Sequence, residues 1–207
     1  MPIKRVLIWG VVLAVLAIAG VMFLDRPLAM AIYDAGTPGA SFLRAATGVI
    51  ETATGFAISK WLMGGVILTA GLIWLAVRKD RLAGWILVFT GASQLTTRLI
   101  AGVLKNVFAR PRPFEALASG GHDAFFSGGS SFPSGHAAHF WPLVFAAAIA
   151  FPRFRWPLLF LALVVSCARV AINDHYFGDV AASAAIAAFV TCGYAALLRS
   201  RITPAAM

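Results

Sequence analysis

The sequence predicts an all-α fold: a six-transmembrane-helix bundle with a polar candidate site at the outer membrane face. Of its 207 residues, 60% are hydrophobic and only 12% are charged, whereas about a quarter of the residues in soluble domains are charged. Apolar runs close to membrane length recur along the chain, with short charged turns between them. Because no internal repeat or low-complexity tail divides the chain, we expect one domain over residues 1–207.

The expected crossings follow one another along the chain and end at charged residues or prolines. They cover approximately residues 6–24, 61–77, 82–104, 136–151, 157–172 and 179–198. Ala17-Ile18-Ala19 resembles a signal-peptide cleavage site, but the apolar run continues to Leu24, which favours a retained helix over a signal peptide. Residues 25–60 are less apolar. Phe42, Val49 and Ile50 recur there at helical spacing, which predicts a segment lying along the membrane surface.

The distribution of basic residues predicts the orientation of the helices. If the N-terminus is cytoplasmic, that side receives nine of the 17 Lys and Arg residues and one acidic residue. These are Lys4, Arg5, Arg78, Lys79, Arg81, Arg153, Arg155, Arg199 and Arg201, with Asp80. The positive-inside rule then places both termini in the cytoplasm. A net charge of +9 would suggest nucleic acid as the partner of a soluble protein, but here it is explained by topology, so we expect no nucleic-acid partner.

Three polar clusters interrupt the apolar chain, and this topology places all of them at the outer face. They read K-x6-R-P at 105–113, P-S-G-H at 133–136 and R-x5-H-x3-D at 169–179. Charged side chains beside a bilayer are costly and are usually functional. The clusters therefore predict a joint site.

The cations of these clusters suit a phosphate group. Arginine binds phosphate oxygens through two parallel hydrogen bonds, and lysine adds a point charge. The backbone at a helix start also attracts anions. The predicted phosphate-binding residues are Lys105, Arg112, Ser134, Gly135 and Arg169. Ser134 could also cap the helix that begins there. We interpret Arg110 differently, as a side chain that extends to the lipid headgroups.

Two histidines and an aspartate supply the candidate catalytic chemistry. His136 could donate a proton to a leaving oxygen. If a helix begins by His175, Asp179 lies on the same helical face and could fix the tautomer of a nucleophilic imidazole, although a structural hydrogen bond is an equal alternative. A metal site formed by His136, His139, His175 and Asp179 is an alternative. The spacing matches no metal motif and neighbouring cations would repel a divalent ion, so we expect neither a metal nor a cofactor.

Together the three clusters resemble the signature of the type 2 phosphatidic acid phosphatase superfamily. The first two blocks match in full, while the third has Ala168 where the family usually has serine. The resemblance implies two-step, metal-independent hydrolysis. It implies that His175 forms a phosphohistidine, Asp179 orients it and His136 protonates the leaving group. The cradle for the phosphoryl oxygens would consist of Lys105, Arg112, Ser134, Gly135 and Arg169.

The resemblance also implies a lipid substrate and a location. Similar proteins act on undecaprenyl pyrophosphate, phosphatidylglycerol phosphate, phosphatidic acid or lipid A phosphates, and in a bacterial inner membrane the outer face is periplasmic. The loop over residues 114–132 is interpreted either as a substrate lip or as a passive connector. Two other functions are alternatives: a lipid phosphotransferase using the same phosphohistidine, and a non-catalytic anion or lipid transporter.

Overall fold

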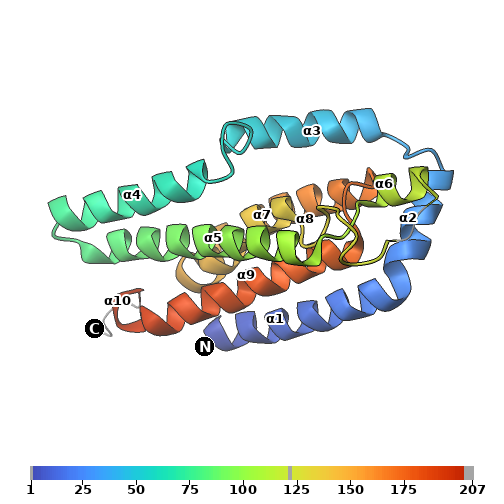
Figure 1. Cartoon of the computed structure of the whole chain (residues 1–207). Helices are drawn as coiled ribbons and strands as arrows, with labels where there is room; N and C mark the ends of the chain where they lie inside the picture. Colours follow the sequence, from blue (N-terminus) through green and yellow to red (C-terminus); the bar gives the residue numbers. More distant parts are fainter. Residues whose placement is uncertain (1, 121–122, 203–207) are drawn as a thin grey trace.

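The computed structural model describes residues 2–120 and 123–202, and within these residues the chain is helical without strands (Figure 1). This confirms the all-α prediction. The long helices are α1 (Pro2–Ala19), α4 (Leu62–Val77), α5 (Arg81–Phe108), α7 (Gly135–Ala150), α8 (Arg155–Ala171) and α9 (Phe177–Leu197). The shorter elements are the π-helix η1 (Gly20–Leu24), α2 (Asp25–Asp34), α3 (Ala40–Ala53), α6 (Pro113–Ala118), the 3-10 helix η2 (Pro152–Phe154) and α10 (Arg199–Ile202).

Helices α5, α7 and α9 pack against one another at the centre of the bundle. Helix α1 lies along α9, α4 along α5, and α8 along α7 (Figure 1). The core contains Phe140, Val144, Val165 and several alanines of α9, whose small side chains allow close helix packing. Helices α4 and α5 also approach closely, because a Cβ at Gly91 would lie 2.6 Å from the backbone nitrogen of Leu68.

A helix is found at each of the six predicted crossings, with ends that differ by a few residues. Among the described residues, four helical segments are long and apolar enough, by length and composition, to cross a membrane, as is typical of a membrane protein. They are Ile3–Asp34, Arg81–Ala118, Pro152–Ala171 and Phe177–Leu197. Helices α4 and α7 have 16 residues each, fewer than the roughly 20 that a straight crossing needs. Six crossings therefore stay a prediction.

The first helix is longer than the sequence predicted. It continues beyond Leu24 through η1 into α2, so the expectation that the surface segment starts at residue 25 is wrong. The Asp25 carboxylate is 1% exposed. It accepts a hydrogen bond from the backbone N–H of Gly178 (2.7 Å) and pairs with Arg110 (2.7 Å). Because these partners compensate its charge, Asp25 lies inside the protein and does not end the helix.

The helix expected between the first two crossings is α3. It lies apart from the bundle in Figure 1 and packs mainly on α8. Phe42 and Val49 on α3 are 73% and 70% exposed. Their spacing therefore marks an outward apolar face, as expected for a helix that lies on a membrane.

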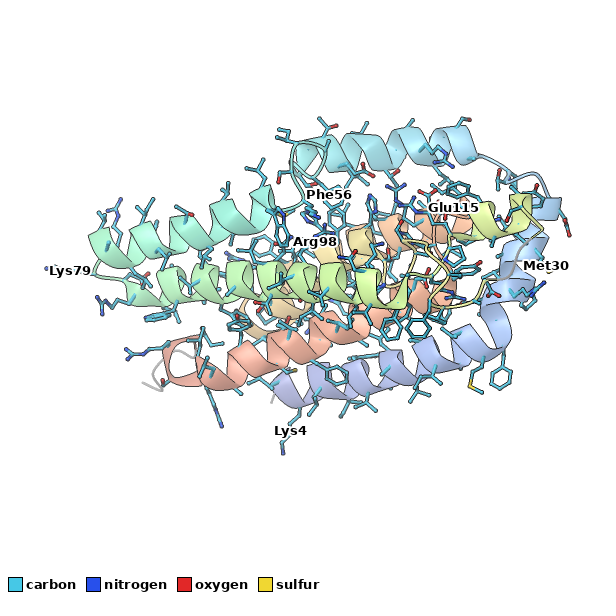
Figure 2. All side chains as sticks on the ribbon, viewed as in Figure 1. Lys4, Met30, Phe56, Lys79, Arg98 and Glu115 are labelled. Atoms are coloured by element: carbon cyan, nitrogen blue, oxygen red, sulfur yellow. The ribbon has the colours of Figure 1, made fainter. Side chains whose placement is uncertain are left out.

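The basic turns gather at one end of the bundle, as the charge pattern predicted. One apolar cluster contains Ile3, Leu82, Phe151 and Ile202. The starts of α1 and α5, the residue after α7 and the end of α10 therefore lie together. Figure 2 shows Lys79 at one end of the molecule, and Met30 and Glu115 at the other. The side of the membrane that each end faces stays a prediction.

We expect Gly178→Ala to destabilise the protein, because a Cβ there would lie 2.8 Å from an Asp25 carboxylate oxygen and 2.8 Å from Val21. Forcing a methyl group into a packed contact typically costs about 1–3 kcal/mol. Gly193→Ala is the matched control on the same helix, since no atom lies within 4 Å of its Cβ position. Thermal unfolding in detergent measures both variants, and equal unfolding midpoints would contradict this account of the contact.

Candidate active site

The start of α9 holds Asp179 and positions His175. The helix begins at Phe177, two residues before the predicted start at about Asp179, so the condition for a shared helical face, a helix that begins by His175, is not met. Asp179 is the third residue of the helix, and its carboxylate accepts a hydrogen bond from the backbone N–H of Tyr176 (2.9 Å). This capping interaction fixes the carboxylate. His175 lies in the preceding turn, with Nδ1 3.6 Å from Asp179 Oδ2.

Ser131, which the sequence analysis did not select, links the histidine to the aspartate. Its hydroxyl donates to Asp179 Oδ2 (2.5 Å) and lies 3.4 Å from His175 Nδ1. A hydroxyl has one hydrogen. Because that hydrogen is directed to Asp179, the serine oxygen accepts from Nδ1–H of His175. The network therefore selects the tautomer in which Nε2 carries the free lone pair.

Arg110 is part of this network, so its interpretation as a headgroup-binding side chain is wrong. It is 1% exposed and pairs with Asp179 (2.8 Å), Asp25 (2.7 Å) and Asp123 (3.2 Å). Its guanidinium group stacks 3.8 Å from the centroid of the Tyr176 ring. Three carboxylates offset the cost of burying this cation. Asp25 and Arg110 are 85 residues apart in the sequence, so no local pattern shows that they pair.

His136 and Arg169 form the second half of the site. Arg169 Nη2 contacts His136 Nε2, and Arg169 Nη1 donates to Asp174 (2.9 Å). Glu51, on α3, contacts both groups: its Oε1 lies 2.6 Å from Arg169 Nη2 and 2.9 Å from His136 Nε2. Glu51 lies in the segment that was predicted to run along the membrane surface, and it belongs to none of the three polar clusters. Its partners are 85 and 118 residues away, so no local pattern reveals it.

The P-S-G-H segment joins the two halves. Ser134 is buried and caps α7, accepting from the backbone N–H of Ala137 (3.5 Å), as predicted. Its own backbone N–H donates to the carbonyl of Asp179 (3.1 Å). Gly135 is the first residue of α7, and Arg98 donates to its carbonyl oxygen. The turn is therefore anchored to both α9 and α5.

The remaining predicted cations lie beside this turn. Lys105 is in the last turn of α5, and its ammonium group donates to the carbonyl of Ser130. Arg112 precedes α6 and lies within electrostatic range of both Lys105 and Arg169. Ala168 is buried in α8 and offers no hydroxyl at the position where the signature departs. The structure thus brings together the predicted residues Lys105, Arg112, Ser134, Gly135, His136, Arg169, His175 and Asp179.

His139 lies outside this cluster. It is fully buried in α7 and shares a 2.8 Å hydrogen bond with Gln94 of α5. Within residues 2–120 and 123–202, no group of three or more His, Cys, Asp or Glu residues is arranged to hold a metal ion. The described side chains of the site are cations, imidazoles and carboxylates.

An apolar cavity of about 330 Å³ lies next to the Arg110 network. Its lining is Ala17, Ile18, Val21, Met22, Phe108, Phe125, Phe126 and Phe132. The rings of Phe125 and Phe132 lie 5.6 Å and 5.1 Å from that of Phe108, and Arg110 lies 4.9 Å from the Phe125 ring. The described part of the 114–132 loop therefore forms a packed aromatic wall beside the site.

Burial lowers the pKa of His175 below its usual value, and the charges of Lys105 and Arg112 lower it further, although Asp179 opposes them. The imidazole is thus held neutral, as a nucleophile requires. The ring has an unperturbed pKa of about 6.5. Folding therefore disfavours protonation of the His175 ring. The contribution of this group to the free energy of unfolding is fully present above this pH, and it is lost as the pH falls towards the pKa of the folded protein.

We expect the His175 ring resonances to show no titration between pH 8 and about 6.5, the unperturbed histidine value. The reason is that the charged ring is disfavoured in its buried position. NMR of the histidine-labelled protein measures this, with His175→Ala assigning the signal among the 4 histidines. A midpoint at or above the unperturbed value would contradict the prediction.

Comparison with known proteins agrees with this geometry. The family model of the PAP2 superfamily matches residues 82–202. A lipid A 1-phosphatase of Rhizobium etli is 31% identical over 175 residues, covering 76% of this chain and 74% of that protein. A lipid A 1-phosphatase of Rhizobium johnstonii is 29% identical over 179 residues, covering 78% and 72%. The chain is accordingly a phosphatase, a hydrolase of phosphoric monoesters. With the matched region holding most of the clustered site, the chain belongs to the PAP2 superfamily.

Proposed function

We propose that the protein hydrolyses a lipid phosphate or diphosphate at the periplasmic face of a bacterial inner membrane, through a phosphohistidine on His175. One observation carries this proposal: Nδ1 of His175 faces Ser131 and Asp179, which leaves Nε2 for the phosphorus atom. The whole chain would act as one domain of six crossings with both termini in the cytoplasm.

In the first step, the lone pair on His175 Nε2 attacks phosphorus and the bond from phosphorus to the lipid oxygen breaks. His136 donates its proton to that leaving oxygen. The forming imidazolium is stabilised by Asp179 through Ser131. The charge on the phosphoryl oxygens is stabilised by Lys105, Arg112, Arg169, Ser134 and the backbone N–H of Gly135.

In the second step, water attacks the phosphohistidine. His136 accepts a proton from this water while its oxygen bonds to phosphorus. The N–P bond breaks, and its electron pair returns to His175 Nε2. Inorganic phosphate leaves, and both histidines return to their starting protonation states. No step uses a metal ion or an organic cofactor.

The substrate class follows from the position of the site and from the relatives. A site among apolar helix ends suits an amphiphile whose phosphate lies at the membrane surface. The two relatives are lipid A 1-phosphatases, so we propose a lipid A-type phosphate first. Phosphatidic acid, phosphatidylglycerol phosphate and undecaprenyl pyrophosphate are the alternatives.

Phosphate release from these four lipids tests the proposal, using purified protein in detergent or nanodiscs. We expect release from at least one lipid, fastest with lipid A, and nearly the same rate in EDTA. Strong inhibition by EDTA would overturn the metal-independent mechanism. Labelled phosphate that moves to an acceptor lipid would identify a phosphotransferase. Lipid binding without turnover would favour a transporter.

A further inference from the structure

Glu51 occupies the place that the proposed mechanism gives to the substrate. Its carboxylate oxygen Oε1 lies 2.6 Å from Arg169 Nη2 and 2.9 Å from His136 Nε2. These are the groups assigned to a phosphoryl oxygen and to the leaving oxygen. Both Glu51 and His136 are only partly buried, with side chains 21% and 16% exposed, so the position is open to exchange. A carboxylate and a phosphoryl oxygen bind the same donors, so they compete for them.

The segment that follows Glu51 covers the same position. The ring of Phe56 lies 4.7 Å from the His136 ring, and Arg98 lies 5.2 Å from the centroid of the Phe56 ring. Figure 2 labels Phe56 and Arg98, which face each other between the outlying segment and the bundle. The C-terminal end of α3 and its following turn therefore close over His136.

The polar attachment of α3 to the bundle rests on two of its side chains, Arg44 and Glu51. The helix packs mainly on α8 and is joined to its neighbours by connections outside any long helix, residues 35–39 and 54–61. Its other ion pair, between Arg44 and Asp174, spans 3.6 Å and has an Arg44 side chain that is 55% exposed. Exposed ion pairs contribute about 0–1 kcal/mol. The contacts of Glu51 are thus the main polar attachment of the helix.

We propose that Glu51 is an internal anionic ligand of the phosphoryl pocket, and that substrate phosphate displaces it while α3 and Phe56 open as a lid. The identity of the pocket rests on the proposed function. The exchange frees Arg169 to bind phosphate and His136 to donate its proton. The closed form cannot bind substrate. The apparent affinity of the protein for substrate is therefore reduced to the fraction of molecules that are open.

Binding of inorganic phosphate to the full chain in nanodiscs tests the exchange without turnover. Glu51→Gln keeps the size of the side chain and removes its charge, and Glu51→Ala removes the contact. We expect both variants to bind phosphate about 10-fold more tightly, the size of a coupling of about 1.4 kcal/mol. Asp34→Asn is the control, since it removes an equal charge from the exposed end of α2. Unchanged or weaker binding in both Glu51 variants would overturn the proposal.

Kinetics separate displacement from a positioning role. If Glu51 is a competitor, both variants lower KM without lowering kcat. A drop in kcat at unchanged KM would instead make Glu51 an orienting partner of His136 and overturn the proposal. The binding assay keeps its meaning if no lipid is hydrolysed: tighter phosphate binding would then support the exchange while the proposed function fails.

Hydrogen exchange tests the movement of the lid. In the unsubstituted protein, phosphate should increase amide exchange over residues 40–53, because the displaced helix loses its attachment. Glu51→Gln should show the faster exchange without phosphate. Protection of this segment by phosphate would contradict the displacement, since it would mean that the anion holds α3 closed.

Discussion

His175→Ala should reduce phosphate release by about 10³-fold or more, because it removes the atom that forms the proposed covalent intermediate. Neither Ser131 nor Asp179 can replace it: the first donates its hydrogen to the second, and both lie on the Nδ1 side of the ring. Inorganic phosphate release from the preferred lipid, measured at saturating substrate, gives the effect on kcat.

Two controls accompany this variant. Asp34→Asn should keep full activity, because its side chain is exposed at the end of α2. Rapid quenching of the unsubstituted protein with labelled substrate should trap an acid-labile phosphoryl label on the chain, and His175→Ala should lack it. Activity within a few-fold of the unsubstituted protein would assign the nucleophile to another residue.

Arg110→Ala should destabilise the protein by about 3–5 kcal/mol, the usual cost of removing one partner of a buried ion pair. It would leave Asp25 and Asp179, each at most 1% exposed, without their shared cation. It should also reduce activity, since one of these carboxylates belongs to the His175 network. Denaturant unfolding in mixed micelles gives the free energy of unfolding.

A double variant distinguishes the loss of charge from the loss of packing. Asp25→Asn combined with Arg110→Gln replaces an ion pair by a neutral hydrogen-bonding pair, so the double variant should be more stable than Arg110→Ala. Arg112→Ala is the comparison, because its side chain is only partly buried, and we expect little change in its unfolding free energy. Equal stability of Arg110→Ala and Arg112→Ala would contradict the role given to the buried network.

The sequence predicted the helices and the three polar clusters because both depend on local spacing. Runs of apolar residues define helices, and motifs such as 133–136 lie on single turns. Ser131, Glu51 and the Asp25–Arg110 pair escaped prediction for the opposite reason. Their partners are 44 or more residues away, and composition says nothing about which distant charges meet.

Two helix boundaries also differ from those predicted, at Asp25 and at the start of α9, and both affect charged residues near the site. Asp25 suggested a helix end because a charge usually marks a membrane boundary, yet its partners allow the helix to continue. A shared helical face for His175 and Asp179 required a helix that begins by His175, but α9 begins two residues after it, at Phe177. The closeness of His175 and Asp179 therefore comes from a turn and a bridging serine rather than from a shared helical face.

The capping of α9 by Asp179 has an evolutionary consequence. Active-site residues are often replaceable at a gain in stability, because a site built for chemistry is strained or unpaired. Here one carboxylate both closes a helix end and supports the histidine. A descendant that lost its activity would still be selected to keep this aspartate for folding. Its presence in a distant sequence is therefore weak evidence of catalysis, whereas the histidine before it is the informative position.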